Sequence, residues 1–228
     1  MERRYLAFDL VGLGPAAKAV PDRETWNAHR RPGISCAAML PSDTGHLVTW
    51  HGRTRDGGVS SRMSEEEAKI MVRKLVDMVS GGYFLVTWNG LSFDLPALAE
   101  ESGLDSECRL LASRHVDMMF HVYCVKGQYL GLDAAATGMG LPGSTPSMAG
   151  IDAARFWTQG KHQLVLDHLA GYLQTTVDVA LAGERRKVLL WTNKRGSSQG
   201  MDLPTGWLTV TEAARVKGID FTQWRWDR

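Results

Sequence analysis

The order of the apolar segments constrains the fold of this chain more than any other feature. Strand-like runs come first, at residues 5–11 ("YLAFDLV"), 34–41 ("ISCAAMLP") and 44–52 ("TGHLVTWHG"), with a hairpin-type "SDTG" between the last two. These runs predict three consecutive antiparallel strands. Strand patterns then alternate with helix patterns along the rest of the chain. This order predicts an α/β fold in which helices flank a mixed sheet of roughly five strands.

The clearest helix pattern occupies residues 64–82, "SEEEAKIMVRKLVDMVSGG". Ser64 is a suitable N-cap, acidic residues fill the first turn, and two glycines end the pattern. Helical spacing predicts that four apolar residues share the buried face: Ile70, Met71, Leu75 and Met78.

The segments around this helix are shorter. Residues 12–33 predict a long loop with room for a short helix. "YFLVTWNG" (83–90) predicts a buried strand, and "SFDLPALAEESG" (92–103) a helix. "RHVDMMFHVYC" (114–124) predicts a strand or a strand–helix junction, and "GLDAAATGMGLPG" (131–143) a short helix. Residues 150–187 predict two helices divided by Gly160.

The composition changes after residue 187. Two β-like runs joined by a polar loop follow, and this part of the chain carries tryptophans that we expect to serve in packing: Trp191, Trp207, Trp224 and Trp226. We therefore predict a main domain at residues 1–187 and, at 188–228, a small β-rich C-terminal extension packed on it.

Charge and cysteine content exclude several classes of protein. The 26 Lys and Arg residues and 25 Asp and Glu residues leave a net charge of +1, so any nucleic-acid binding must depend on a local patch. Cys36, Cys108 and Cys124 form no CxxC pair, which argues against a cysteine-based zinc site and fits a reducing cytoplasm. The sequence predicts no membrane span and no signal peptide, and hence a cytoplasmic protein without a membrane partner.

Asp9 is unusual because it lies inside an apolar strand-like run, "AFDLVG". A buried carboxylate costs several kcal/mol unless a cation, a donor or a metal compensates it. Asp9 is therefore either a residue at the end of the strand or part of a site.

Three motifs give the chain a specific resemblance. Asp9 lies on the first strand, "TWNGLSFDLPAL" contains Asp94, "HVDMM" and "LDAAATGMGLPG" follow, and a late helix carries His168 and Tyr172. The chain resembles the DEDD-type (DnaQ-like) 3′–5′ exonucleases of the ribonuclease-H-like superfamily. Their motifs are D-x-E, T-x-N-G-x-x-F-D, and Y-x-x-x-D or H-x-x-x-x-D. The resemblance extends over residues 5–182.

The resemblance implies phosphodiester hydrolysis at a 3′ end of DNA or RNA. Two divalent ions, Mg²⁺ or Mn²⁺, about 4 Å apart would activate water and stabilise the leaving oxygen, held by four acids. Asp9 and Asp94 would bind metal, and His168 or Tyr172 would position or deprotonate the attacking water. Near the cleft, Trp88, Asn89 and Phe93 would contact nucleic acid, the two aromatic rings by stacking on a terminal base.

Two of the four acids are missing. Val11 replaces the second acid of D-x-E, and valine has no ligand for a metal. One alignment of the third motif puts His168 at the tyrosine and Tyr172 at the aspartate, and the other puts Tyr172 at the tyrosine and Thr176 at the aspartate. Asp178 is turned by about 240° from Tyr172, so it lies on another face of the helix. The metal site is thus expected to be weakened.

The same residues also have simpler interpretations. Asp94 suits a helix N-cap, and Asp9 a hydrogen-bonded strand end. His115 and Asp117 are expected to hold the fold together, Trp88 and Phe93 are of a type that is common in a core, and His168 suits an exposed helix face.

Two functions follow from these observations. The first is a divergent 3′–5′ exonuclease with a weakened metal site. The alternative is a catalytically inactive module of the same fold that binds nucleic acid or a protein partner. Because two of the four acids are missing, we expect weak or absent catalysis, with Mg²⁺ or Mn²⁺ bound weakly if it is bound at all.

Overall fold

The computed structural model describes residues 3–12, 33–143, 148, 150–192 and 196–219. Most of the predicted loop at 12–33, together with Trp224 and Trp226, lies outside the described residues.

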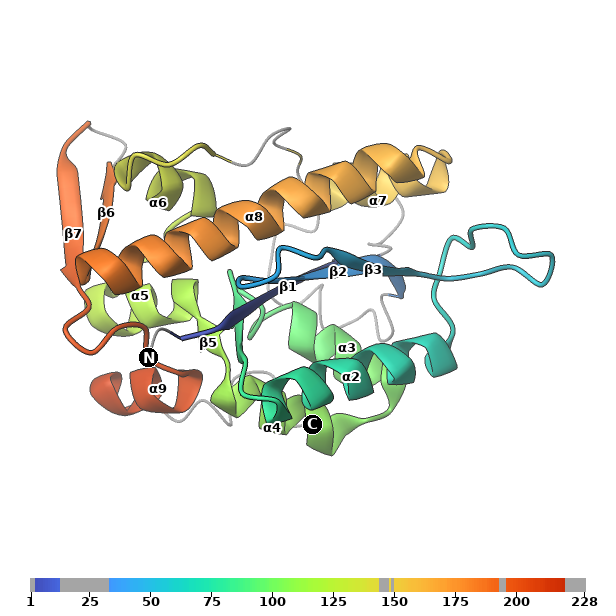
Figure 1. Cartoon of the computed structure of the whole chain (residues 1–228), viewed down its shortest axis with the longest axis horizontal. Helices are drawn as coiled ribbons and strands as arrows, with labels where there is room; N and C mark the ends of the chain where they lie inside the picture. The colour runs from blue at the N-terminus through green and yellow to red at the C-terminus, as the bar shows by residue number, and fades with distance from the viewer. Residues whose placement is uncertain (1–2, 13–32, 144–147, 149, 193–195, 220–228) are drawn as a thin grey trace.

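A mixed sheet lies at the centre of the described structure (Figure 1). Its strand order is β3-β2-β1-β4-β5; β1 and β2 are antiparallel, as are β2 and β3, whereas β4 and β5 run parallel to β1. The strands are β1 (Tyr5–Gly12), β2 (Ile34–Pro41), β3 (Val48–His51), β4 (Phe84–Thr87) and β5 (Val116–Asp117). The predicted mixed sheet of five strands is confirmed.

Helices cover both faces of this sheet. In Figure 1, α6, α7 and α8 lie on one side and α2, α3 and α4 on the other. The helices are α2 (Glu65–Ser80), α3 (Asp94–Ser102), α4 (Asp105–Arg114), α5 (Met118–Lys126), α6 (Leu132–Gly138), α7 (Gly150–Thr158), α8 (His162–Arg186) and α9 (Val210–Lys217). The strand–helix junction predicted at residues 114–124 is the boundary between β5 and α5.

The alternation of side chains along β1 divides the core into two layers. Tyr5, Ala7 and Val11 belong to the layer that includes the apolar residues of α8. Leu6 and Leu10 belong to the layer formed with α2 and α3. Because successive side chains of a strand point to opposite faces, Asp9 and Val11 lie on the same face as each other, toward α8.

Helix α2 begins as the sequence predicts. The side chain of Ser64 accepts a hydrogen bond from the Glu67 backbone N–H, and the Glu67 side chain accepts one from the Ser64 backbone N–H. The predicted buried face is wrong at Ile70, which is 53% exposed. The residues that are buried instead form a continuous helical stripe with spacing i, i+3, i+4 and i+7: Ala68, Met71, Val72 and Leu75.

The C-terminal extension contains the antiparallel strands β6 (Val188–Thr192) and β7 (Ser198–Asp202). Helix α9, which the sequence did not predict, follows them and begins with Thr209 as its N-cap. The buried Trp207 donates from its indole nitrogen to the Ala180 carbonyl of α8 at 3.0 Å. The extension therefore packs on α8, while the boundary at residue 187 stays a prediction.

Glu184 joins the extension to the first strand. Its Oε1 accepts hydrogen bonds from the Tyr5 hydroxyl at 2.6 Å and from the Trp207 backbone N–H at 3.0 Å. The guanidinium of Arg3 also contacts Glu184 and donates to the Trp207 carbonyl. These contacts fix the start of β1 against α8 and so help to set the position of Asp9 farther along the strand.

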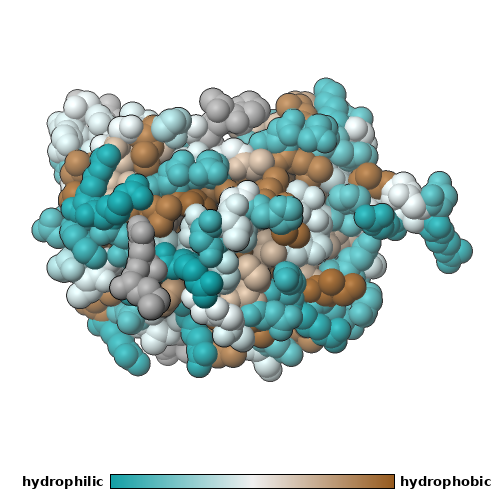
Figure 2. Space-filling view, viewed as in Figure 1, coloured by the Kyte–Doolittle hydropathy of each residue, from teal (hydrophilic) through white to brown (hydrophobic). Residues whose placement is uncertain are grey.

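The segment between β3 and α2 projects from the body of the molecule (Figure 1), and its tip is hydrophilic (Figure 2). It turns through the backbone hydrogen bond from Thr54 N–H to the Gly58 carbonyl, at 2.9 Å. Residues 53–59 therefore form an exposed turn, and the segment returns to the core at Met63, which is 4% exposed. Among the described residues, no helix is long and apolar enough to cross a bilayer.

Candidate functional site

Asp9 and Asp94 meet beside the first strand. Asp9 is half-buried on β1, and Asp94, the first residue of α3, is only 2% exposed. Their side chains share a hydrogen bond, and Asp94 Oδ1 also accepts one from the Leu10 backbone N–H at 3.2 Å. The structure thus brings together two carboxyl groups that are 85 positions apart in the sequence (94 minus 9).

The turn after β4 brings Asp94 to this position. Asn89 takes a left-handed conformation with φ of 76°, and the Gly90 carbonyl accepts a hydrogen bond from Leu95 N–H at 3.0 Å. A side chain at Gly90 would meet the Thr87 side chain at 2.5 Å. The "NG" of the motif therefore serves a tight turn that returns the chain toward β1.

Asp117 holds this turn in place. Its carboxylate accepts hydrogen bonds from the backbone N–H groups of Asn89, at 3.1 Å, and Leu91, at 2.9 Å. It also accepts one from Phe120 N–H at 2.9 Å, as the N-cap of α5. The buried His115 shares a 2.7 Å hydrogen bond between its Nδ1 and the Ala112 carbonyl. These contacts support the structural roles predicted for both residues.

Asp94 does not cap its helix. The N-cap position of α3 belongs to Phe93, and no side chain there makes a capping hydrogen bond. The Asp94 carboxyl faces β1 instead, where it accepts a hydrogen bond from the Leu10 backbone N–H. The geometry therefore favours the site interpretation of Asp94 over the capping interpretation.

Burial and mutual repulsion disfavour ionisation of the acid pair. Burial raises the pKa of Asp9 to about 7, against the lowering effect of its hydrogen bonds. Burial also raises the pKa of Asp94 well above its ordinary range, and the adjacent charge of Asp9 adds to this rise. Two carboxyl groups in such contact cannot both ionise readily, so they titrate as a coupled pair.

Tyr172 of α8 lies in the field of these acids. Its pKa is raised well above the usual value, mainly by burial and then by the negative charges of Asp9 and Asp94. Thr176, one turn later and 1% exposed, donates its hydroxyl hydrogen to the Tyr172 carbonyl at 2.9 Å. Tyr172, which one alignment of the third motif places at the missing acid and the other at the tyrosine, thus interacts electrostatically with the acid pair.

His168 lies one turn before Tyr172, and the two ring centroids are 6.2 Å apart. It is 8% exposed, so it is not the surface residue of the simpler interpretation. Asp178 accepts a hydrogen bond from the exposed Gln174 side chain at 3.0 Å. It adds no carboxylate to the acid pair.

The donor set does not fit a pair of metal ions. Val11 is 5% exposed and lies in the apolar layer under α8, so it offers only methyl groups on the face that carries Asp9. Within the described part of the chain, no group of three or more His, Cys, Asp and Glu side chains could hold a metal. Divalent magnesium prefers several oxygen ligands, and among residues 3–12, 33–143 and 150–192 Asp9 and Asp94 are the two carboxyl groups that meet here.

The three residues predicted to contact nucleic acid differ in how deeply they are buried. Trp88 is 6% exposed and donates its indole N–H to the Leu130 carbonyl at 2.8 Å, which favours the core role over stacking on a base. Asn89 and Phe93 are half-buried. A Cβ added at Gly12 would lie 3.3 Å from Phe93 Cζ, so the Phe93 ring lies against the end of β1 near the acid pair.

Sequence reasoning did not assign three residues to this site. Asp117 and Asp133 both raise the pKa of Tyr172 by their charge, and Cys36 pairs with Val11 across β1 and β2. Burial and the charge of Asp9 raise the pKa of the Cys36 thiol. The motifs "HVDMM" and "LDAAATG" contain Asp117 and Asp133. A sequence motif does not show how far either acid lies from Tyr172.

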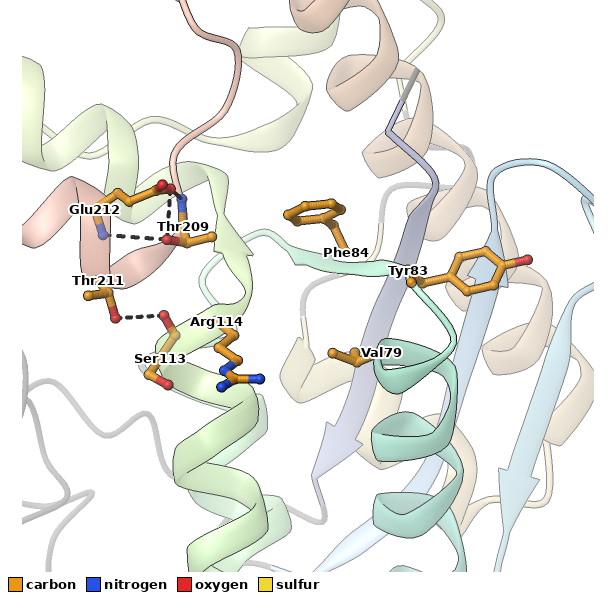
Figure 3. A pocket seen from close by; sticks show the side chains of 9 residues that line it. Val79, Tyr83, Phe84, Ser113, Arg114, Thr209, Thr211 and Glu212 are labelled. Atoms are coloured by element: carbon orange, nitrogen blue, oxygen red, sulfur yellow. Dashed lines mark hydrogen bonds between the residues drawn. The ribbon is translucent and has the colours of Figure 1, made fainter. Parts of the chain in front are cut away.

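A separate cavity of about 480 Å³ opens at the other end of β4 (Figure 3). Several of its polar groups are engaged in the fold: Thr211 donates to the Ser113 carbonyl at 2.8 Å, and Thr209 and Glu212 cap α9. None of the site residues predicted from the sequence lines it. The lining residues are Val79, Gly82, Tyr83, Phe84, Ser113, Arg114, Thr209, Thr211 and Glu212.

Comparison with known families agrees with this architecture. The sequence pattern of the RNase H superfamily matches residues 43–177, more than half of the chain, and the chain belongs to this superfamily. Its mixed five-stranded sheet with flanking helices is an RNase H-like α/β fold, to which a small two-stranded sheet is added at the C-terminal end.

Among solved structures, the chain is similar to the family B DNA polymerase from the hyperthermophilic archaeon Pyrobaculum calidifontis. The sequence identity is 18% and the TM-score is 0.48. The match covers 82% of this chain and 24% of the polymerase chain, so this chain spans about a quarter of that protein. A search of curated proteins gives no match.

Proposed function

We propose that this protein binds the 3′ end of a nucleic acid at the Asp9–Asp94 pair and hydrolyses phosphodiesters weakly or not at all. Membership of the RNase H superfamily supports a nucleic-acid ligand. One observation supports the proposal: Val11 shares the strand face of Asp9, and Tyr172 lies in the field of Asp9 and Asp94. The resemblance to DEDD-type exonucleases would put carboxylates at these two positions.

The electrostatics explain why catalysis would be weak. Four carboxylates offset the charge of two divalent ions, and the ions stabilise both the attacking and the leaving oxygen. Here burial raises the pKa of both carboxyl groups, so the pair carries less negative charge than two free carboxylates would. Such a pair would hold at most one Mg²⁺ or Mn²⁺, and weakly.

The divergent exonuclease remains a second candidate because Tyr172 lies in the field of the acids and His168 lies one helical turn from it. Their ring centroids are 6.2 Å apart, and the imidazole is a group that can position or deprotonate a water molecule. This candidate requires that one weakly held ion and these two side chains suffice for hydrolysis.

Degradation of labelled oligonucleotides separates the two candidates. We expect the unmodified protein to bind 5′-labelled single-stranded DNA or RNA, yet to shorten it no faster, within roughly tenfold, than an Asp9→Ala, Asp94→Ala variant in Mg²⁺ or Mn²⁺. Robust metal-dependent shortening that the double variant lacks would support the divergent exonuclease. Failure to bind either oligonucleotide, with the fold intact, would contradict nucleic-acid binding and favour a protein partner.

A further inference from the structure

Two stacked tyrosines stand on the surface beside α5. The ring centroids of Tyr123, on α5, and Tyr129, just after it, are 4.9 Å apart, and the rings are parallel to within 9°. Although one face of Tyr129 is covered by Tyr123, the residue is still 59% exposed. A ring that is covered on one face and still exposed to this extent presents its other face to solvent.

Positive charge accompanies the stack. The Lys217 ammonium of α9 lies 4.3 Å from the Tyr123 ring centroid and donates to the Tyr123 carbonyl at 3.1 Å. Lys126 is exposed at the end of α5, and the stretch from Val125 to Tyr129 contains no acidic residue. Aromatic faces next to lysines are the chemistry by which proteins hold single-stranded nucleic acid, through base stacking and phosphate contacts.

The segment that carries Tyr129 is joined to the candidate site. The next residue, Leu130, accepts the indole hydrogen bond of Trp88, which directly precedes Asn89. Four positions after Tyr129, Asp133 is close enough for its charge to raise the pKa of Tyr172. The stack therefore stands on a segment that contacts Trp88, next to the turn that carries Asn89, and that continues to Asp133 near Tyr172.

We propose that the exposed face of Tyr129 stacks on a base of a single strand whose end occupies the Asp9–Asp94 site. The inference rests on the proposed function and adds the class of ligand: a single strand with an unpaired base near its bound end. Lys217 and Lys126 face the flanking phosphates. Stacking tolerates any base, so this contact gives affinity without sequence preference.

Fluorescence anisotropy with a short 5′-fluorescein-labelled oligothymidylate tests the contact at constant salt. Tyr129→Ala should weaken binding roughly tenfold or more, because base–aromatic stacking is lost. Tyr129→Phe keeps the ring face and should bind as the parent does. Tyr83→Ala is the matched control, since it removes a half-buried tyrosine whose ring is covered by Arg4 at 4.5 Å. It should leave binding unchanged.

The outcomes separate this inference from the function on which it rests. If the parent protein fails to bind the oligothymidylate, the proposed function fails. If the parent binds and Tyr129→Ala binds equally well, only the stacking contact is overturned. Equal losses in Tyr129→Ala and Tyr83→Ala, or in Tyr129→Ala and Tyr129→Phe, would also overturn it, because neither pattern follows from the Tyr129 ring face.

Discussion

A variant that combines Val11→Glu with Tyr172→Asp is expected to degrade single-stranded nucleic acid from the 3′ end in Mg²⁺, at least about 100-fold faster than the parent. Val11 shares a strand face with Asp9, and Tyr172 feels the charges of Asp9 and Asp94. Carboxylates at both positions would give four converging acids, enough to hold a pair of ions and offset their charge.

The matched control is Val11→Glu with Thr176→Asp, which adds the same charges. Positions 172 and 176 are one helical turn apart, about 6 Å along the axis, so they cannot both reach one ion pair. We expect no gain from the control, because the Thr176 hydroxyl is bonded to the Tyr172 carbonyl and Tyr172 holds the position near the acids. Activity in the control alone would show that the alignment favoured here is wrong.

The activities of the two variants can be compared only if both proteins remain folded. Val11 is 5% exposed, so a glutamate there costs several kcal/mol unless a cation or solvent compensates it. Circular dichroism and thermal unfolding in Mg²⁺ measure whether both variants remain folded. If both are folded and both are inactive, the cleft has been remodelled for another ligand, and superfamily membership predicts architecture alone.

The second large effect is on stability as a function of pH, measured without divalent ions. The folded pKa of Asp9 is about 7, and the unfolded pKa of aspartate is about 3.9. Between these values the folded state binds more protons than the unfolded state, so stability falls as pH rises through this window. Asp9→Asn removes the titration of Asp9 and also the charge that adds to the rise in the Asp94 pKa, so it should flatten the profile.

Urea unfolding in a chelator at about pH 5 and about pH 8 measures this effect. We compare the free energy of unfolding of Asp9→Asn with that of the parent. The difference, variant minus parent, should be about 2 kcal/mol larger at the higher pH than at the lower one. The buried His115 and His121, whose pKa values are lowered by burial, titrate in both proteins and cancel in the comparison. Parallel profiles would mean that Asp9 is already ionised at the lower pH.

The sequence predicts most of this fold because local patterns and the order of elements determine it. The capping box at Ser64, the alternation along β1 and the "TWNG" turn each have a direct physical signature. Ile70 is a residue for which the local pattern gave a wrong prediction. It fits the helical spacing of the buried face, but a neighbouring stripe of α2 packs against the core and Ile70 is exposed. Helix α9 was missed because its start follows a β-like "WLTV".

The candidate site was only partly predictable. Asp9 and Asp94 could be found from motifs, but their mutual hydrogen bond depends on the turn that Asp117 holds. Spacing does not choose between Tyr172 and Thr176, since both fit a helical motif. The charge effect of Asp9 and Asp94 on Tyr172 depends on the position of α8 over β1, which the sequence does not show. The burial of Trp88 likewise depends on Leu130, which is 42 positions away.

Isothermal titration calorimetry with Mn²⁺ and with Mg²⁺ tests the central claim most directly, because it counts bound ions without requiring a substrate. The Asp9–Asp94 pair predicts at most one weak site near neutral pH, and that site should be lost in an Asp9→Asn, Asp94→Asn variant. Two tight sites in the unmodified protein, both abolished by the double variant, would contradict the account.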